Sequence, residues 1–157
     1  MEIERKYLLS QLPDAKPTKV YRMEQAYLCD APVLRVRRRV CLPDGTAECF
    51  LTVKGGGKIV RQEFELPISE TKYEQLKAKH EGRVICKKRY LYPLYDAYVA
   101  EVDVFEKEYE GLILAEVEFQ DEEAMARFVA PDWFGPDVSW DRRYHTSVMA
   151  LGKEEQA

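Results

Sequence analysis

The chain has few of the residues that usually build a zinc site or a disulfide framework. Its 157 residues include 4 cysteines and 2 histidines. No two cysteines have C-x-x-C spacing, and neither histidine has a partner at ligand spacing, which disfavours a zinc centre. The cysteines are therefore expected to be free thiols of a reducing compartment.

Long apolar runs and an excess of positive charge are also missing. No run is long enough to cross a membrane, and charged residues stand at the N-terminus, where a signal peptide needs an apolar stretch. The net charge of −4 and a pI near 5.4 disfavour bulk nucleic-acid binding. They do not exclude a small anionic ligand bound by local basic residues. These absences predict a cytoplasmic protein with neither a membrane nor a nucleic-acid partner.

The composition is that of an ordinary folded domain. Hydrophobic residues make up 46% of the chain and charged residues 33%, which excludes a disordered protein. At this length, residues 1–157 are expected to form a single domain with a substantial core.

Charge that alternates along extended segments is the most informative feature that the chain does have. Glu2, Glu4 and Lys6 alternate with Ile3 and Arg5. Residues two apart on a strand point to the same face, so two carboxylates and an ammonium stand in one row. A single such row could be a solvated sheet face.

The same alternation recurs along the chain, and the sign of the charged side chains changes from one segment to another. The repeats are Arg35 and Arg37; Lys54; Arg61, Glu63 and Glu65; Lys87 and Arg89; Glu101 and Asp103; and Glu116 and Glu118. Like charges at i and i+2 repel unless something of opposite charge lies between strands. Bound cations would offset the acidic pairs and a polyanion the basic ones, so a functional role is favoured over surface decoration.

Strand patterns predominate and predict a closed barrel. Eight strands are predicted near 2–9, 19–29, 34–41, 47–53, 58–66, 83–92, 97–105 and 113–119, with a hairpin turn at 43–45 and a glycine loop at 55–57. Helices are predicted after Ser69, after Asp121 and over 144–151. Antiparallel strands that close into a barrel leave no exposed edge. The charged faces would line the inside, and the opposite faces would pack outward under the helices: Val36, Phe64, Val102, Val104, Val117 and Phe119.

The two kinds of charge together point to phosphoryl chemistry. Clustered carboxylates suit hard divalent cations such as Mg²⁺ or Mn²⁺. Clustered arginines and lysines suit phosphate oxygens, and arginine can bind them with two parallel hydrogen bonds. In phosphoryl transfer the protein positions the phosphates while metals neutralise developing charge.

The ordered set of charged elements resembles one family over nearly the full chain. Residues 2–6 are similar to the ExExK signature of the CYTH domain, or triphosphate tunnel metalloenzyme, superfamily. Further elements of that family are similar to Arg35-Val36-Arg37, Thr52-Val53-Lys54, the segment 61–65, Lys87-Lys88-Arg89, Glu116-Val117-Glu118 and the closing segment 138–144.

The resemblance implies a mainly β, α+β fold: an eight-stranded antiparallel barrel whose tunnel holds a triphosphate, with a few helices packed outside. It implies metal ligands at Glu2, Glu4, Glu116 and Glu118, with Mg²⁺ or Mn²⁺ as the metal. Glu63, Glu65, Glu101 and Asp103 would hold a second metal or orient basic residues. The phosphates would be bound by Arg35, Arg37, Lys54, Arg61, Lys87, Arg89 and Arg143. Lys6 would contact the substrate or help to orient or activate the attacking water, and a carboxylate such as Glu4 is the other candidate base.

The function implied is metal-dependent hydrolysis of inorganic triphosphate, with nucleoside triphosphates as further substrates. Two alternatives share the scaffold: a class IV-type adenylyl cyclase and a thiamine triphosphatase. A third is a non-catalytic binder of polyphosphate or nucleotide, which would need few carboxylates. The small-molecule triphosphate is the expected partner, and a homodimer is compatible with the sequence.

Overall fold

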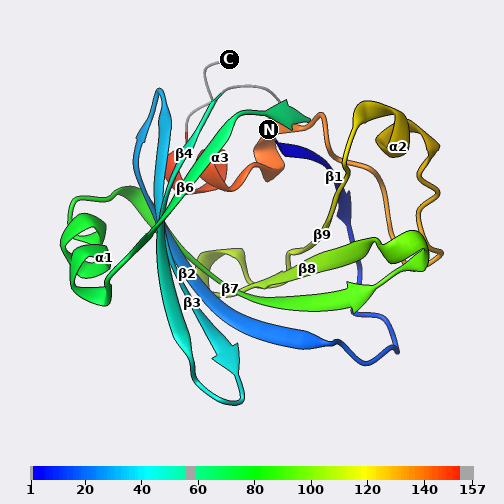
Figure 1. Cartoon of the computed structure of the whole chain (residues 1–157), viewed down its shortest axis with the longest axis horizontal. Helices are drawn as coiled ribbons and strands as arrows, with labels where there is room; N and C mark the ends of the chain where they lie inside the picture. The colour runs from blue at the N-terminus through cyan, green and yellow to red at the C-terminus, as the bar shows by residue number, and fades with distance from the viewer. Residues whose placement is uncertain (1, 56–58, 153–157) are drawn as a thin grey trace.

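The computed structural model describes residues 2–55 and 59–152 and shows a strongly curved sheet with short helices (Figure 1). The strands in the described ranges are β1 (Glu2–Leu8), β2 (Lys19–Asp30), β3 (Val33–Leu42), β4 (Ala47–Lys54), β5 (Val60–Arg61), β6 (Glu63–Ile68), β7 (Glu81–Pro93), β8 (Val99–Phe105) and β9 (Ile113–Glu118). The α-helices are α1 (Glu70–Lys77), α2 (Glu122–Arg127) and α3 (Thr146–Leu151), and 3-10 turns are η1 (Tyr95–Ala97), η2 (Lys107–Tyr109) and η3 (Arg142–Tyr144).

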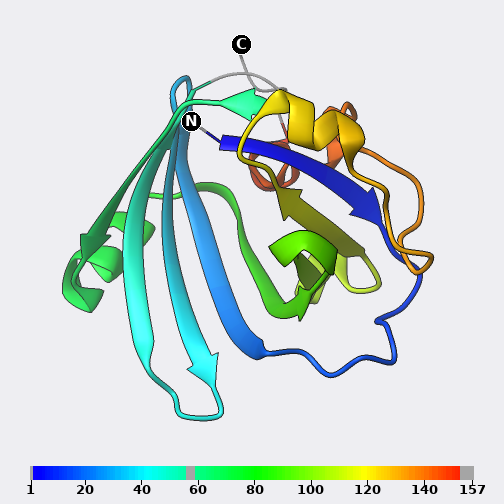
Figure 2. The same ribbon diagram turned by 45° about the vertical axis from the view of Figure 1, so that its right-hand side comes forward.

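All of these strands belong to one antiparallel sheet that is nearly closed into a barrel. Its order is β5-β1-β9-β8-β7-β2-β3-β4-β6. The two edge strands, β5 and β6, are separated in the chain by Gln62 alone, so the chain itself joins the two ends of the sheet. Figures 1 and 2 show the strands curving round into a nearly closed barrel, which confirms the prediction.

The strand count differs from the expected eight because the segment predicted at 58–66 is divided. Val60–Arg61 pairs with β1, whereas Glu63–Ile68 pairs with β4 on the other side of the opening. Lys58, where that strand was expected to begin, and most of the predicted glycine loop lie outside the described residues. None of the helices in the described ranges is long and apolar enough to cross a membrane.

The main hydrophobic core lies on the outer face of the barrel, as the alternation predicts. Val102 and Val117 have no exposed surface, and they pack with Phe119 and with Phe128, which follows α2. A smaller outer cluster holds Val36 under α1, whose N-terminus is capped by the Ser69 side chain. These outward-facing clusters leave the inner face available for polar groups.

Two predictions about the outer layer and the helices are wrong in detail. Phe64 is 69% exposed, whereas Ile68, on the same face at the other end of β6, packs against the cluster under α1. Helix α3 does not pack outside: Met149 and Ala150 contact Ile85 and Phe105 in a cluster on the inner side. Figure 1 shows α3 within the curve of the sheet. This apolar cluster fills one part of the barrel interior, and charged residues line the rest of the inner face.

The close approach of α3 to β7 depends on a glycine. Gly82 has a φ of +62°, and a Cβ placed on it would lie 2.0 Å from the backbone oxygen of Ala150. Any side chain there would clash and be strained, so Gly82 lets the helix close the barrel.

Candidate active site in the charged tunnel

The strand register brings the alternating charges onto one face. Directly paired residues of antiparallel strands point to the same side of a sheet. The paired positions are Glu2 with Arg61, Glu4 with Glu118, Lys6 with Glu116, Lys54 with Glu63, Arg89 with Asp103, and Glu101 with Glu116. Rows that are separate in the sequence therefore become one charged lining inside the barrel.

A cavity in the barrel is lined by most of the residues predicted for the site. They are Glu2, Glu4, Lys6, Arg35, Arg37, Lys54, Arg61, Glu63, Lys87, Arg89, Glu101 and Glu116. Such a concentration of charge in a half-closed space is costly unless the charges are paired or meet a ligand. The cavity is therefore the candidate active site.

Two acidic side chains at one side of the tunnel, Glu4 and Glu118, have raised pKa values, whereas Lys6 and Arg89 outweigh burial and lower the pKa of Glu116. Burial and the neighbouring Glu116 and Glu2 raise the pKa of Glu4 to about 8. Burial, Glu2 and Glu101 also raise the pKa of Glu118. Carboxylates that repel one another in a buried site are stabilised by a cation, so this donor set fits a hard divalent metal.

The carboxylates of this side are not gathered into a ready-made metal cage. In the described part of the chain, no three His, Cys, Asp or Glu side chains form a group that could hold a metal ion. Instead Glu2 Oε1 lies 3.3 Å from Lys54 Nζ, and Glu116 Oε1 lies 3.4 Å from Lys6 Nζ. Metal binding would therefore require these carboxylates to exchange their contacts with lysine for contacts with the metal.

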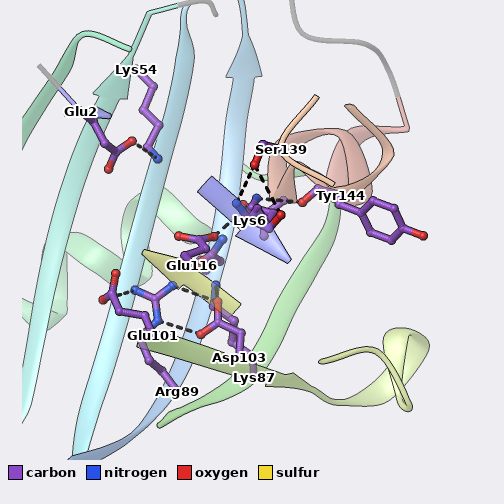
Figure 3. Close-up of polar contacts among 12 residues, drawn as sticks. Glu2, Lys6, Lys54, Lys87, Arg89, Glu101, Asp103, Glu116, Ser139 and Tyr144 are labelled. Carbon is purple, nitrogen blue, oxygen red and sulfur yellow. Dashed lines mark hydrogen bonds and ion pairs between the residues drawn. The ribbon is translucent and has the colours of Figure 1, made fainter. Parts of the chain in front are cut away.

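Lys6 is held in the tunnel by contacts on both its side chain and its backbone (Figure 3). Its Nζ donates to the backbone oxygen of Tyr144 at 2.9 Å, and its backbone N donates to Ser139 Oγ at 2.8 Å. Burial alone would lower the pKa of Lys6, but the carboxylates of Glu116 and Glu4 raise it. Lys6 is consequently a cation that can donate hydrogen bonds and cannot accept a proton.

A second basic group is organised by Asp103, which is 1% exposed. Asp103 accepts from Lys87 Nζ at 2.7 Å and from Arg89 Nε at 2.7 Å, and Arg89 also reaches Glu101 at 3.1 Å (Figure 3). Burial together with Arg89 and Arg37 outweighs the attraction of Asp103 and lowers the pKa of Lys87 to about 7. Asp103 thus orients two basic side chains that line the cavity.

The arginines of β3 have neutral partners. Arg37 donates from Nε and Nη2 to the side-chain oxygen of Gln25, at 3.1 and 3.0 Å. Arg35 donates from Nη2 to Thr52 Oγ1 at 3.3 Å, and its buried Nε has no hydrogen-bond partner. Burial and the nearby Arg35 and Arg89 lower the pKa of Arg37 to about 9. The side-chain partners of both arginines are therefore uncharged.

Some predicted site residues do not line this cavity. Glu118 is exposed and borders a neighbouring groove together with Glu101. Glu65 is exposed and accepts from Thr52 Oγ1 at 3.5 Å. The Arg143 side chain is 80% exposed and pairs with Asp141 at 2.6 Å, and it does not line the cavity. The structure therefore does not bring Arg143 to the tunnel.

Other lining residues were not predicted from the sequence. Tyr27, His145, Thr146 and Ser147 border the cavity, and Tyr27 Oη lies 2.5 Å from Thr146 Oγ1. Tyr27 shares the inner face with Gln25, but β2 lacks a like-charge pair that would have indicated it. His145 and its neighbours enter the site through the docking of α3, which no local pattern predicts.

Comparison with known proteins places the chain in a family. No family model matches it. It is 40% identical over 153 residues to an inorganic triphosphatase of Nitrosomonas europaea, covering 96% of this chain and 97% of that protein. It is 37% identical over 151 residues to an inorganic triphosphatase of Acetivibrio thermocellus, covering 94% and 92%.

Solved structures are similar over the same length. The crystal structure of an inorganic triphosphatase has a TM-score of 0.70 and 38% identity, covering 98% of this chain and 97% of that one. A Hippeastrum protein has a TM-score of 0.59 at 16% identity, covering 80% and 83%, and supports the fold alone. With these similarities beside the charged tunnel, the chain belongs to the inorganic triphosphatases of the CYTH, or triphosphate tunnel metalloenzyme, superfamily.

Proposed function

We propose that the protein hydrolyses inorganic triphosphate to pyrophosphate and phosphate inside the tunnel, with Mg²⁺ or Mn²⁺ as the required metal. The observation that carries this proposal is a buried cavity lined by both carboxylates and basic side chains, on a chain similar over nearly its full length to inorganic triphosphatases. Nucleoside triphosphates are proposed as weaker substrates, because the tunnel offers contacts for phosphates and few for a base.

The basic side chains hold the phosphate chain. The cavity is lined by Arg35 and Arg37 from β3, Lys54 from β4, Arg61 from β5, and Lys87 and Arg89 from β7. Arginines offer paired donors to phosphate oxygens, whereas the lysines act as point charges. Cations from several strands would hold the triphosphate extended and in one orientation, which lowers the entropic part of the barrier.

The carboxylates of β1 and β9 are the proposed metal ligands. Glu2 and Glu4 come from β1, and Glu116 and Glu118 from β9, which pairs with it. A divalent cation bound there would neutralise charge on the transferred phosphoryl group and lower the pKa of a bound water. Glu63, Glu65 and Glu101 remain candidates for a second cation, whereas Asp103 is assigned to orienting Lys87 and Arg89.

Lys6 and Glu4 are the proposed catalytic residues. Because Lys6 is protonated, its role is to donate hydrogen bonds to the substrate or to the attacking water. Glu4 lies two residues away on the same face. A bound divalent cation would favour its ionised form, and as a carboxylate it is the candidate acceptor of the proton that the water releases.

The experiment is a phosphate-release assay on the purified full chain with tripolyphosphate and Mg²⁺ or Mn²⁺. We expect one phosphate and one pyrophosphate per substrate, and no release in EDTA. A parallel incubation with ATP, analysed for cyclic AMP, tests the cyclase alternative. Absence of phosphate release with every divalent metal tried would exclude the hydrolase.

A further inference from the structure

Four cations of the tunnel differ from the two arginines of β3 in the kind of side chain that holds them. Lys6, Lys54, Lys87 and Arg89 each lie within 3.4 Å of a carboxylate oxygen. Neither Arg35 nor Arg37 forms an ion pair with any residue in the ranges that the structure describes. The neutral partners of these two arginines are therefore a distinct feature of the site.

The partner of Arg37 is a side chain that does not itself line the cavity. Gln25 has no exposed surface and lies behind Arg37 on the neighbouring strand. A guanidinium has only donors, so the amide oxygen of Gln25 must face Arg37 and its NH₂ group must face away. That group donates to Tyr27 Oη at 3.0 Å, and Tyr27 Oη in turn contacts Thr146.

We propose that Gln25 is a positioning residue that orients Arg37 toward the phosphate chain without neutralising its charge. This inference rests on the proposed function and names the residue that keeps the β3 arginines available to the substrate. A carboxylate at position 25 would make the same two contacts to Arg37, but it would compete with the phosphate for the guanidinium.

The contacts of Arg35 are consistent with this arrangement. Its acceptor, Thr52, is also neutral and has no exposed surface, and the Arg35 Nε is buried without a hydrogen-bond partner. An unpartnered buried donor beside the cavity costs free energy that an anion can offset. Arg35 and Arg37, two residues apart on one face, thus form a pre-oriented anion anchor.

The test compares two substitutions at position 25 that differ in charge and in shape. Gln25→Glu keeps the shape and adds a negative charge, whereas Gln25→Met removes the hydrogen bonds and adds none. We expect the KM for tripolyphosphate to rise about tenfold or more in Gln25→Glu and by roughly threefold in Gln25→Met, with kcat changed less than about threefold. If Gln25 only fills space, KM should rise more in Gln25→Met than in Gln25→Glu, because glutamate is the milder change of shape.

A matched control separates local from general charge effects. Gln11→Glu adds the same charge on an exposed loop residue and should leave KM and kcat as in the wild type. In an Arg37→Met background, Gln25→Glu should add little to the KM, because the guanidinium through which it acts is gone. An undiminished effect of Gln25→Glu in that background would overturn the assignment.

A binding measurement separates this inference from the proposed function. Calorimetric titration of tripolyphosphate in EDTA reports anion binding without turnover, and Gln25→Glu should weaken it in the same proportion as KM rises. A wild type that binds but never hydrolyses would refute the hydrolase and leave the role of Gln25 standing. A wild type that hydrolyses, with Gln25→Glu equal to it in KM and binding, would refute the role of Gln25. If both variants at position 25 fail to fold, nuclear magnetic resonance of the wild type is the deciding measurement. The Arg37 Nε–H signal is assigned by its loss in Arg37→Lys. Hydrogen exchange of this signal as fast as that of an exposed arginine would contradict the proposal.

Discussion

The outer and inner faces of the same strands are buried in different ways. On β8, Val102 is fully buried in an aromatic-rich outer cluster, while the adjacent Asp103 is buried on the inner face between Lys87 and Arg89. Both side chains are hidden from water, but for different reasons. The outer face is buried by apolar packing, which stabilises the fold, and the inner face by a charge network, which serves a ligand.

This difference means that stability and activity can be changed separately. Removing an outer side chain leaves a cavity and should lower the free energy of unfolding. Neutralising an inner carboxylate can instead relieve repulsion and leave the fold intact while abolishing function, as expected where a site is strained for its ligand.

The largest effect is expected from Glu4→Gln, on the inner face. Glu4 is a proposed metal ligand and proton acceptor, so tripolyphosphate hydrolysis should fall by about a thousandfold or more, equivalent to roughly 4 kcal/mol. The melting temperature without metal should not fall, because Gln resembles the protonated carboxyl that the site favours. Phosphate release and calorimetry measure the two effects, and unchanged turnover would contradict the role of Glu4.

The matching change on the outer face is Phe128→Ala. Phe128 is 7% exposed and packs against Phe119, Tyr95 and Phe134. Truncating a buried phenylalanine typically costs about 3–5 kcal/mol of unfolding free energy. Denaturant unfolding should show this loss, while KM and kcat of the folded protein at low temperature stay near wild type. A change in KM without loss of stability would mean that the two faces are not independent.

A smaller effect concerns the pH dependence of stability without metal. Burial and the neighbouring Glu116 raise the pKa of Glu4 to about 8 in the folded state, from an ordinary value of 4.5. Between these values the folded state binds the extra proton, so this group's contribution to stability falls as pH rises and levels off above pH 8. Urea unfolding in EDTA should therefore show that the free energy of unfolding falls more between pH 5 and pH 8 in the wild type than in Glu4→Gln. Parallel curves would show that Glu4 is not the group responsible.

The smallest effect is expected from Arg143→Ala. The resemblance to the family places Arg143 at the phosphates, but its side chain is largely exposed and pairs with Asp141 outside the cavity. Steady-state assays should give KM and kcat within about twofold of wild type. A tenfold rise in KM would show that η3 turns inward when the substrate binds.

Much of the barrel could be predicted locally because strand alternation is a local property. The predicted strands match β1 to β4 and β7 to β9 within a few residues, and the row Glu2, Glu4 and Lys6 lies on the inner face as expected. The helix caps at Ser69 and Asp121 were also recognisable from side-chain chemistry. Alternation alone does not predict the exposure of Phe64, because that exposure depends on how far along β6 the cluster under α1 extends.

The sequence by itself determined which residues alternate and hence which side chains share a face, because the period of a strand is two. Only the tertiary structure decided which charge meets which: that Asp103 serves both Lys87 and Arg89, that Gln25 holds Arg37, and that α3 brings His145 to the cavity. These contacts join strands and helices far apart in the chain. They depend on register and on the closure of the sheet, which no short stretch of sequence encodes.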